Sequence, residues 1–176
     1  MRLYRLAYAA ACLTALLIGH PGFAQTQPPA QSPRPAPTPL ALPIEGLREV
    51  AWGGDAGHFI DRMASVDGSI VVWVWMFKRD EMTVAGHVHN TTALHNVFNC
   101  GARTRAVIRS ELYNDGRFLV GAGGSRVLEY PTNPDSVDGR IWAAVCKGEF
   151  PVGARTFTTL DAARAAVDSH FAATGR

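Results

Sequence analysis

Three histidines lie close together in the sequence and could bind a metal ion. His87 and His89 face the same way if their segment is extended, and His95 could return to them across a hairpin. Because imidazole nitrogens bind zinc and copper, one hypothesis is a small metal-binding or enzymatic protein that uses this segment. Residues 90–92 (Asn-Thr-Thr) indicate a loop, however, and no carboxylate or thiolate completes a set of ligands. Solvent-exposed loop histidines are the simpler interpretation, and we expect no metal and no cofactor.

Three arginines form a second group with binding chemistry. Arg103, Arg105 and Arg109 share one face of an extended strand, and a row of guanidinium groups would bind an acidic polysaccharide, a lipid phosphate or an acidic protein surface. Val107 and Glu111 have the same parity, so the row is interrupted and partly neutralised. A solvated sheet face with local ion pairs is the simpler interpretation, and partner binding by the three arginines is the alternative.

No arrangement of residues indicates catalysis. The serines lie in no Gly-x-Ser-x-Gly sequence, and no two carboxylates have a spacing that places them across a cleft. We therefore expect no enzyme activity. The formal net charge of +2 argues against nucleic acid as a partner, and 47% hydrophobic residues are too many for a wholly disordered chain of 176 residues.

The first 24 residues have the pattern of a cleavable signal peptide. Arg2 and Arg5 precede an apolar run over residues 6–18, and Gly22 and Ala24 supply small residues at the cleavage site. The sequence therefore predicts export to the periplasm, the cell surface or the medium. No membrane span is expected after cleavage, and retention as an uncleaved anchor is the alternative.

A proline-rich segment follows over residues 25–43. It holds seven of the eleven prolines, which favour extended polyproline II backbone and cannot build a core. We interpret the segment as a disordered linker. A ligand for a proline-binding partner is the alternative.

Signal cleavage would also remove Cys12 and leave Cys100 and Cys146. Two cysteines in an exported chain most simply form one disulfide, because the compartment is oxidising. Their spacing matches neither a zinc site nor a Cys-x-x-Cys redox pair. Lipidation of Cys12 is the alternative to signal cleavage after Ala24, although Cys12 lies inside the apolar run and only alanines directly precede it.

Residues 69–78 give the strongest strand pattern, since β-branched and aromatic residues fill them. Alternation places Val72 and Val74 on one face and Trp73 and Trp75 on the other. Both faces are apolar, which predicts a central strand covered on both sides. The tryptophans either pack under a helix or form an exposed platform, which makes Trp73 and Trp75 candidate partner-binding residues.

Two helices are expected after the strands. Asp135 or Ser136 would cap a helix that runs into Cys146. Thr158 or Thr159 would cap a second helix over about residues 160–173, whose narrow apolar stripe would dock on the domain or on a partner. That stripe consists of Leu160, Ala163, Val167 and Phe171.

Turn residues at 66–69 and 114–116 separate the shorter strands. The predicted fold class is α+β: a mostly antiparallel β-sheet with a helix packed on one face, one disulfide and a C-terminal amphipathic helix. The shorter strands are expected over residues 58–61, 97–100, 104–113, 117–120 and 127–130.

The region from Trp52 to Phe150 resembles the bacterial surface-adhesin protein E family. The resemblance implies an antiparallel sheet with a helix on one face, a disulfide that maps onto Cys100 and Cys146, an envelope or surface location, and binding of host proteins as in characterised members. Residues 82–99 contain no Lys or Arg, so they offer no basic adhesive segment. The residues that carry the resemblance are Asp61 with 65–68 leading into 71–73, then 97–100, 111–116 and 133–137.

Together these patterns predict four segments: a signal peptide (1–24), a proline-rich disordered linker (25–43), a protein E-like α+β domain (44–152) and a C-terminal helical tail (153–176). The favoured function is an exported binding module that contacts a protein or another envelope component, with a homodimer as a further possibility. The alternatives are the metal-binding or enzymatic histidine protein and a purely structural envelope factor.

Overall fold

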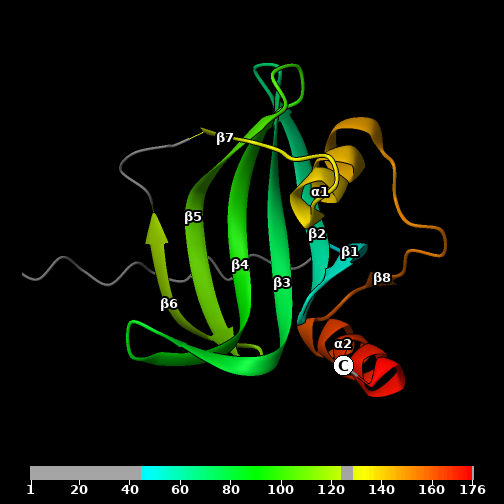
Figure 1. The fold of residues 1–176 in the computed structure, drawn as a ribbon. Helices are drawn as coiled ribbons and strands as arrows, with labels where there is room; N and C mark the ends of the chain where they lie inside the picture. Colours follow the sequence, from blue (N-terminus) through cyan, green and yellow to red (C-terminus); the bar gives the residue numbers. More distant parts are fainter. Residues whose placement is uncertain (1–44, 124–128, 176) are drawn as a thin grey trace, which may run out of the picture. The chain divides into compact units, whose positions relative to one another are not determined.

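The structure is a computed structural model, and it describes residues 45–123 and 129–175. The predicted signal peptide, the predicted linker and the first two residues of the strand predicted over 127–130 lie outside the described residues. The described residues form eight strands and two helices (Figure 1). The elements are β1 (Leu47–Gly53), β2 (Ala56–Val66), β3 (Ser69–Val84), β4 (His87–Asn99), β5 (Thr104–Asn114), β6 (Arg117–Gly123), β7 (Glu129–Pro131), α1 (Val137–Lys147), β8 (Thr156–Phe157) and α2 (Leu160–Thr174).

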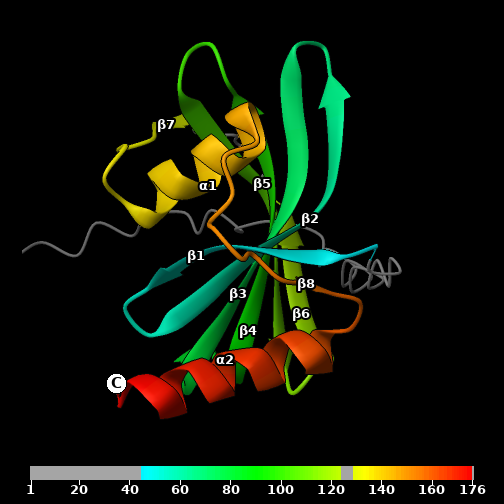
Figure 2. The ribbon, with the colours of Figure 1, turned by 90° about the vertical axis from the view of Figure 1, so that its right-hand side faces the viewer.

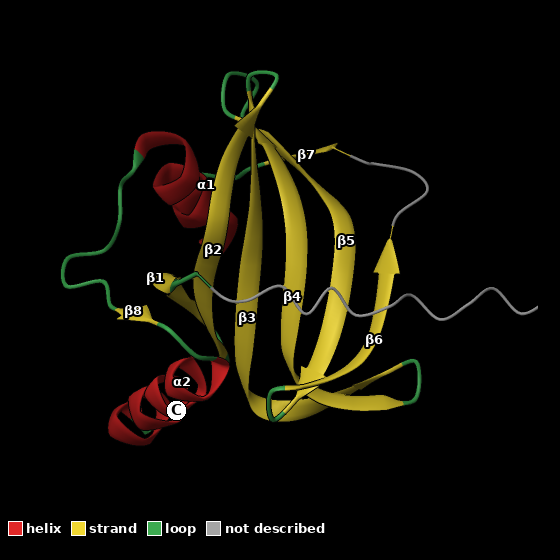
Figure 3. Cartoon of the chain, turned by 180° about the vertical axis from the view of Figure 1, so that it is seen from behind, coloured by secondary structure: helices red, strands yellow, loops and turns green. Residues whose placement is uncertain are grey.

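All strand pairs in the sheet are antiparallel, which confirms the predicted sheet type. The order is β6-β5-β4-β3-β2-β1-β8, and β7 pairs with β5 beside this path. Figure 3 shows the long strands β2 to β6 side by side. Each strand from β1 to β6 is therefore a neighbour of the next, joined by hairpins such as the turn at Asp67 and Gly68, both of which have positive φ.

β3 is the central strand, and its two faces build two separate cores. Val72 and Val74 pack in a cluster with Ile141 and Val145 of α1. On the other face, Trp73, Trp75 and Phe77 belong to a cluster that includes Ala163, Val167 and Phe171 of α2. The prediction of a central strand covered on both sides is confirmed. We call these the α1 face and the α2 face; Figure 2 shows the two helices apart, with β1 and β8 between them.

α1 is fixed at both ends by its own sequence and by a disulfide. The Ser136 hydroxyl accepts a hydrogen bond from the Gly139 N–H, so Ser136 is the N-cap, and Gly148 ends the helix in the left-handed conformation. Cys146 forms the predicted disulfide with Cys100, directly after β4. In the chain-entropy model, closing a loop of this length stabilises the fold by about 4 kcal/mol.

The last strand and helix belong to the same sheet and to the core on the α2 face. β8 pairs with β1 through Leu47 and Phe157, and Thr159 caps α2 by accepting a hydrogen bond from the Ala162 N–H. α2 buries Ala163, Ala166, Val167 and Phe171. Among the described residues, neither helix has the length and apolar character needed to cross a membrane.

The loop predicted at residues 90–92 is wrong, because these residues lie inside β4 and are buried. Asn90 usually favours turns because its amide competes with backbone hydrogen bonds. Here the Asn90 amide nitrogen donates to the Asp115 carboxylate (2.8 Å), and its amide oxygen accepts from the Asp115 N–H (3.3 Å). The β5–β6 turn thus satisfies Asn90, and the strand continues through it.

Candidate functional site

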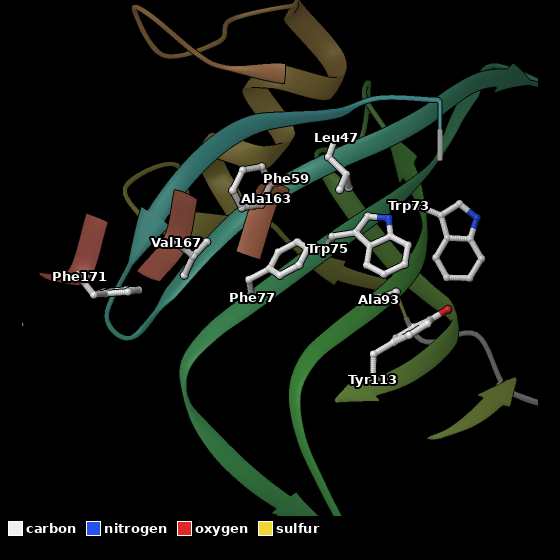
Figure 4. Packing of buried hydrophobic residues seen from close by; sticks show 10 residues of the cluster. All are labelled: Leu47, Phe59, Trp73, Trp75, Phe77, Ala93, Tyr113, Ala163, Val167 and Phe171. Carbon is white, nitrogen blue, oxygen red and sulfur yellow. The ribbon is translucent and has the colours of Figure 1, made fainter. Parts of the chain in front are cut away.

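The two tryptophans of β3 are buried, each with 7% of its surface exposed. The Trp73 ring stacks on His95 with centroids 4.7 Å apart, and the Trp75 ring lies 5.2 Å from the Tyr113 ring. Figure 4 shows the rings of Trp73, Trp75 and Tyr113 beside one another on the α2 face. Neither indole therefore forms an exposed platform for a partner. Both pack in the core on the α2 face, as the first of the two sequence interpretations describes.

The shared face predicted for Arg105 and Arg109 is wrong, because β5 contains a bulge. His95 pairs with Arg109 and Asn96 with Val107, so β5 has one residue more than β4 at this point. The extra residue reverses the parity along β5. Arg105 consequently lies on the α1 face, where it forms an ion pair with Asp138 (3.1 Å), and Arg109 lies on the α2 face.

Arg103 also has a partner within the chain. Its guanidinium carbon lies 4.5 Å from the centroid of the Trp142 ring of α1. Its backbone φ of 55° places it in the turn before β5 rather than in the strand. The arginines therefore make local contacts at separate places and form no continuous cationic row.

The three histidines lie along β4 and do not converge. His95 is six residues from His89, which corresponds to about 20 Å along a strand. His95 stacks on Trp73, and His89 is buried near the carbonyl of His87. Within residues 45–123 and 129–175, no three His, Cys, Asp or Glu side chains are grouped so that they could hold a metal ion.

The bulge in β5 creates a polar group inside the aromatic α2 face, which we call the Arg109 cluster. Cross-strand pairing sets two rows: Trp73, His95 and Arg109 in one, and Trp75 and Glu111 in the next. Tyr113, two residues further along β5, completes the cluster. Its members are Trp73, Trp75, His95, Arg109, Glu111 and Tyr113.

Glu111 is the acceptor at the centre of the Arg109 cluster. Its side chain is 2% exposed, and it accepts hydrogen bonds from Arg109 Nε (2.7 Å) and from the Tyr113 hydroxyl (2.6 Å). Burial, together with the bond to Glu111, raises the pKa of Tyr113, so this hydroxyl stays protonated and donates. Burial and then the nearby Arg109 charge lower the pKa of His95, so the ring is neutral at pH 7.

A second feature is the end of the β3–β4 hairpin, residues 82–89, which we call the β3–β4 tip. Met82, Val84 and Val88 are 38%, 45% and 45% exposed there. Ala85 and Gly86 both have positive φ, as the two central residues of a tight hairpin turn require. No other described strand pairs with the tip, so both of its backbone edges are open.

A large bulge at the base of the hairpin sets the direction of the tip. Between Phe77 and Met82 β3 has three residues more than β4 has between Thr91 and His89. Arg164 of α2 donates to the carbonyls of Lys78 and Arg79 in this bulge. At the bottom of Figure 3 the hairpin turns sideways, out of the direction of the long strands. The tip is thus a two-stranded ribbon held at its base by α2.

The tip was missed in the sequence analysis because the predicted strand that begins at Ser69 ended at residue 78, whereas β3 continues to Val84. The available signal was Ala-Gly at 85–86 between Met-Thr-Val and His-Val-His, which is a two-residue turn between short β-prone runs. The charged residues of the bulge, Arg79 to Glu81, interrupt the apolar pattern, so the predicted strand ended before this turn.

A groove of about 260 Å³ lies beside α2, next to the β5–β6 turn. Phe77 and Leu160 supply apolar lining, and Asp115, Asp161 and Asp168 supply carboxylates. Asp168 forms an ion pair with Arg164 (2.7 Å), and Asp115 binds Asn90. Two of the three carboxylates therefore have partners in the chain.

Comparison with known proteins gives one structural likeness. No protein-family model matches the sequence, and no curated protein matches it. Among solved structures, crystal form II of Haemophilus influenzae protein E is similar, with a TM-score of 0.43 and 13% sequence identity over 52% of this chain and 80% of that chain. The family resemblance carried by the sequence motifs stays a prediction.

Proposed function

We propose that this chain is an exported binding module without catalytic activity, which contacts a partner protein of the cell envelope through the β3–β4 tip. The observation that carries the proposal is the tip itself: a projecting ribbon with exposed apolar side chains and two open backbone edges. Folded proteins often protect such edges with lysine or proline. Residues 82–89 contain no Lys, Arg or Pro, so the tip lacks that protection.

The partner we infer is an extended segment of another protein that adds to the ribbon as a strand. An added strand receives backbone hydrogen bonds from the open edge, and alternate side chains supply specificity. Met82 and Val84 lie on one face of the ribbon, and Val88 lies on the other. Each half-exposed apolar side chain that becomes buried contributes about 1 kcal/mol, so the contact suits a weak or transient complex.

Export is supported by the disulfide between Cys100 and Cys146, because such bonds persist in oxidising compartments. It agrees with the signal-peptide pattern of residues 1–24. Mass spectrometry of the protein isolated from cell envelopes is expected to show a chain that begins at Gln25 and has no free thiol. A chain that retains Met1 and carries two free thiols at Cys100 and Cys146 would overturn this part of the proposal.

Site-specific photo-crosslinking in living cells tests the contact. A photoreactive amino acid at Met82, which is 38% exposed, is expected to give one defined adduct. This adduct should disappear when Val84→Lys/Val88→Lys is introduced into the same labelled protein. The matched control is Met63, which is 51% exposed in β2, outside the tip. A photoreactive group at Met63 should give no such adduct, and Met63→Lys should not affect the adduct at position 82. Equal adducts at positions 63 and 82, or none at either, would contradict the proposal.

A further inference from the structure

The Arg109 cluster contains two buried hydrogen-bond donors that the described part of the chain does not use. Arg109 Nη2 and the indole nitrogen of Trp75 have no partner among residues 45–123 and 129–175, although both atoms are buried. Trp75 is 7% exposed, so ordinary solvent contact does not satisfy its N–H. Buried polar groups in folded proteins are nearly always paired, and an unpaired donor is unfavourable. Two such donors in adjacent rows of one sheet face indicate a place where an acceptor binds.

The neighbouring strand leaves room beside Arg109. Gly123 pairs with Arg109 and Gly121 pairs with Glu111, so β6 presents no side chain at either position. A Cβ at Gly121 would already lie 3.2 Å from Glu111 Cγ and 3.4 Å from Arg109 Nη2, whereas a Cβ at Gly123 would meet no described atom closer than 3.8 Å, so the room is at Gly123. The Arg109 side chain is 20% exposed and His95 is half-buried, so the cluster can be reached from solvent.

We propose that the Arg109 cluster binds a small neutral ligand with a planar apolar body and a carbonyl oxygen, such as an aromatic amide. The carbonyl oxygen accepts from the two free donors, and the planar body packs among the aromatic side chains of the α2 face. This site lies on the α2 face of the sheet, away from the β3–β4 tip, and does not depend on the function proposed for the tip.

The charges of the cluster favour a neutral ligand over an ionic one. Arg109 and Glu111 form an ion pair, so their charges offset one another. Both Glu111 oxygens already accept hydrogen bonds, which leaves a cation without a ready carboxylate. An anion would lie beside Glu111 in a mostly buried site, where an uncompensated charge is unfavourable. A neutral carbonyl satisfies the donors without that unfavourable contribution.

Three small probes of matched size test the ligand class: benzamide, benzoate and benzylamine. Each is titrated into the ¹⁵N-labelled oxidised mature protein, and the indole N–H signals are followed by NMR, with Trp75→Phe identifying the Trp75 signal. Benzamide is expected to shift the Trp75 signal with saturation, and to bind at least tenfold more tightly than the two charged probes. The Trp142 indole is an internal control, because it is also buried without a partner but lies on the α1 face.

Two leucine substitutions on β6 test the location. Gly123→Leu places a side chain beside Arg109 and is expected to weaken benzamide binding at least tenfold. Ala122→Leu adds the same side chain to the opposite face, since Ala122 pairs with Ser110, and should leave binding unchanged. Unchanged Trp52 and Trp142 signals show that each variant is folded.

Any of three results would overturn the proposal. In the first, no probe shifts the Trp75 signal up to the solubility limit of the probe, which would mean that only water meets the donors. In the second, benzoate or benzylamine binds more tightly than benzamide. In the third, the Gly123→Leu variant is folded and binds benzamide as tightly as the parent protein does.

Discussion

The two faces of the sheet are held by different means and carry different chemistry. α1 is tied covalently through Cys100 and Cys146, and Arg140 of this helix donates to the carbonyl of Trp52 (2.8 Å). α2 has no covalent link and docks by its buried apolar side chains and by Arg164. The unpaired Arg109 and Trp75 donors and the base of the β3–β4 tip are both on the α2 side. The features proposed for binding therefore lie on the α2 side, and the crosslinked helix lies on the opposite face.

The largest effect is expected from removing the disulfide. The double variant Cys100→Ser/Cys146→Ser should lower the free energy of unfolding by about 4 kcal/mol, because the unfolded chain loses its crosslink. Urea denaturation measures the loss. Hydrogen exchange should show that α1 opens more readily than α2 in this variant. Equal protection of both helices would contradict the conclusion that the disulfide is what holds α1 on its face.

The matching test on the other face is Phe171→Ala, which removes a ring that is 6% exposed. Large-to-small substitutions of this kind cost about 3 kcal/mol. Because α2 has no crosslink, the loss should appear mainly as opening of α2 and β8, with α1 still protected from exchange. His170→Ala is the control on the neighbouring position, where the ring stacks on Trp52 at the surface (3.7 Å between centroids); it should cost less than Phe171→Ala.

The free energy of unfolding is expected to depend on pH through His58, which lies on the α1 face. Burial, followed by the charges of Lys78, Arg105 and Arg140, lowers the pKa of His58 to about 4 from its usual 6.5, while Asp55 acts in the opposite direction. Above pH 6.5 the ring is neutral in both states. As the pH falls below 6.5 the unfolded chain binds the proton first, so stability falls until the folded ring also protonates near pH 4.

From this shift, the free energy of unfolding should be about 2 kcal/mol lower at pH 5 than at pH 7. Urea denaturation at the two values checks it. His58→Gln, which does not titrate, should remove most of the difference. A pH dependence that is the same with and without His58 would show that other groups cause it.

Local pattern predicted much of the fold, and long-range pairing decided the rest. The alternation in β3, the hairpin turn at 114–116, the Ser136 cap and the disulfide all depend on residues near in sequence or on cysteine number, and each is confirmed. The face of Arg109 depends on a bulge that exists only because β5 pairs with β4. Asn90 lies in a strand because Asp115, 25 residues away, binds its amide. Neither partner is visible in the local sequence.

The candidate site was only partly predictable, because residue types can be read from the sequence but long-range strand pairing cannot. Trp73, Trp75, His95 and Arg109 were recognised as residues with binding chemistry, but the strand register that gathers them into one cluster with Glu111 and Tyr113 could not be derived from their spacing. The three-residue bulge that ends at Met82 likewise follows from pairing with β4 and from Arg164, which is 86 residues from Lys78.

The smallest effect on stability is expected at the tip, and it separates binding from folding. Val84→Lys/Val88→Lys should change the free energy of unfolding by no more than about 0.5 kcal/mol, because both side chains are exposed and neither belongs to the α1 or α2 core. The hairpin base stays attached through Asn90 to Asp115 and through Arg164 to the bulge carbonyls. Urea denaturation of this variant beside Met63→Lys checks the expectation.

If the double variant loses more than about 1 kcal/mol, the tip is part of the α2-side structure. A lost crosslink would then report unfolding rather than a missing contact. If stability is unchanged and the crosslink is lost, the apolar side chains at the tip are present for a partner and not for the fold.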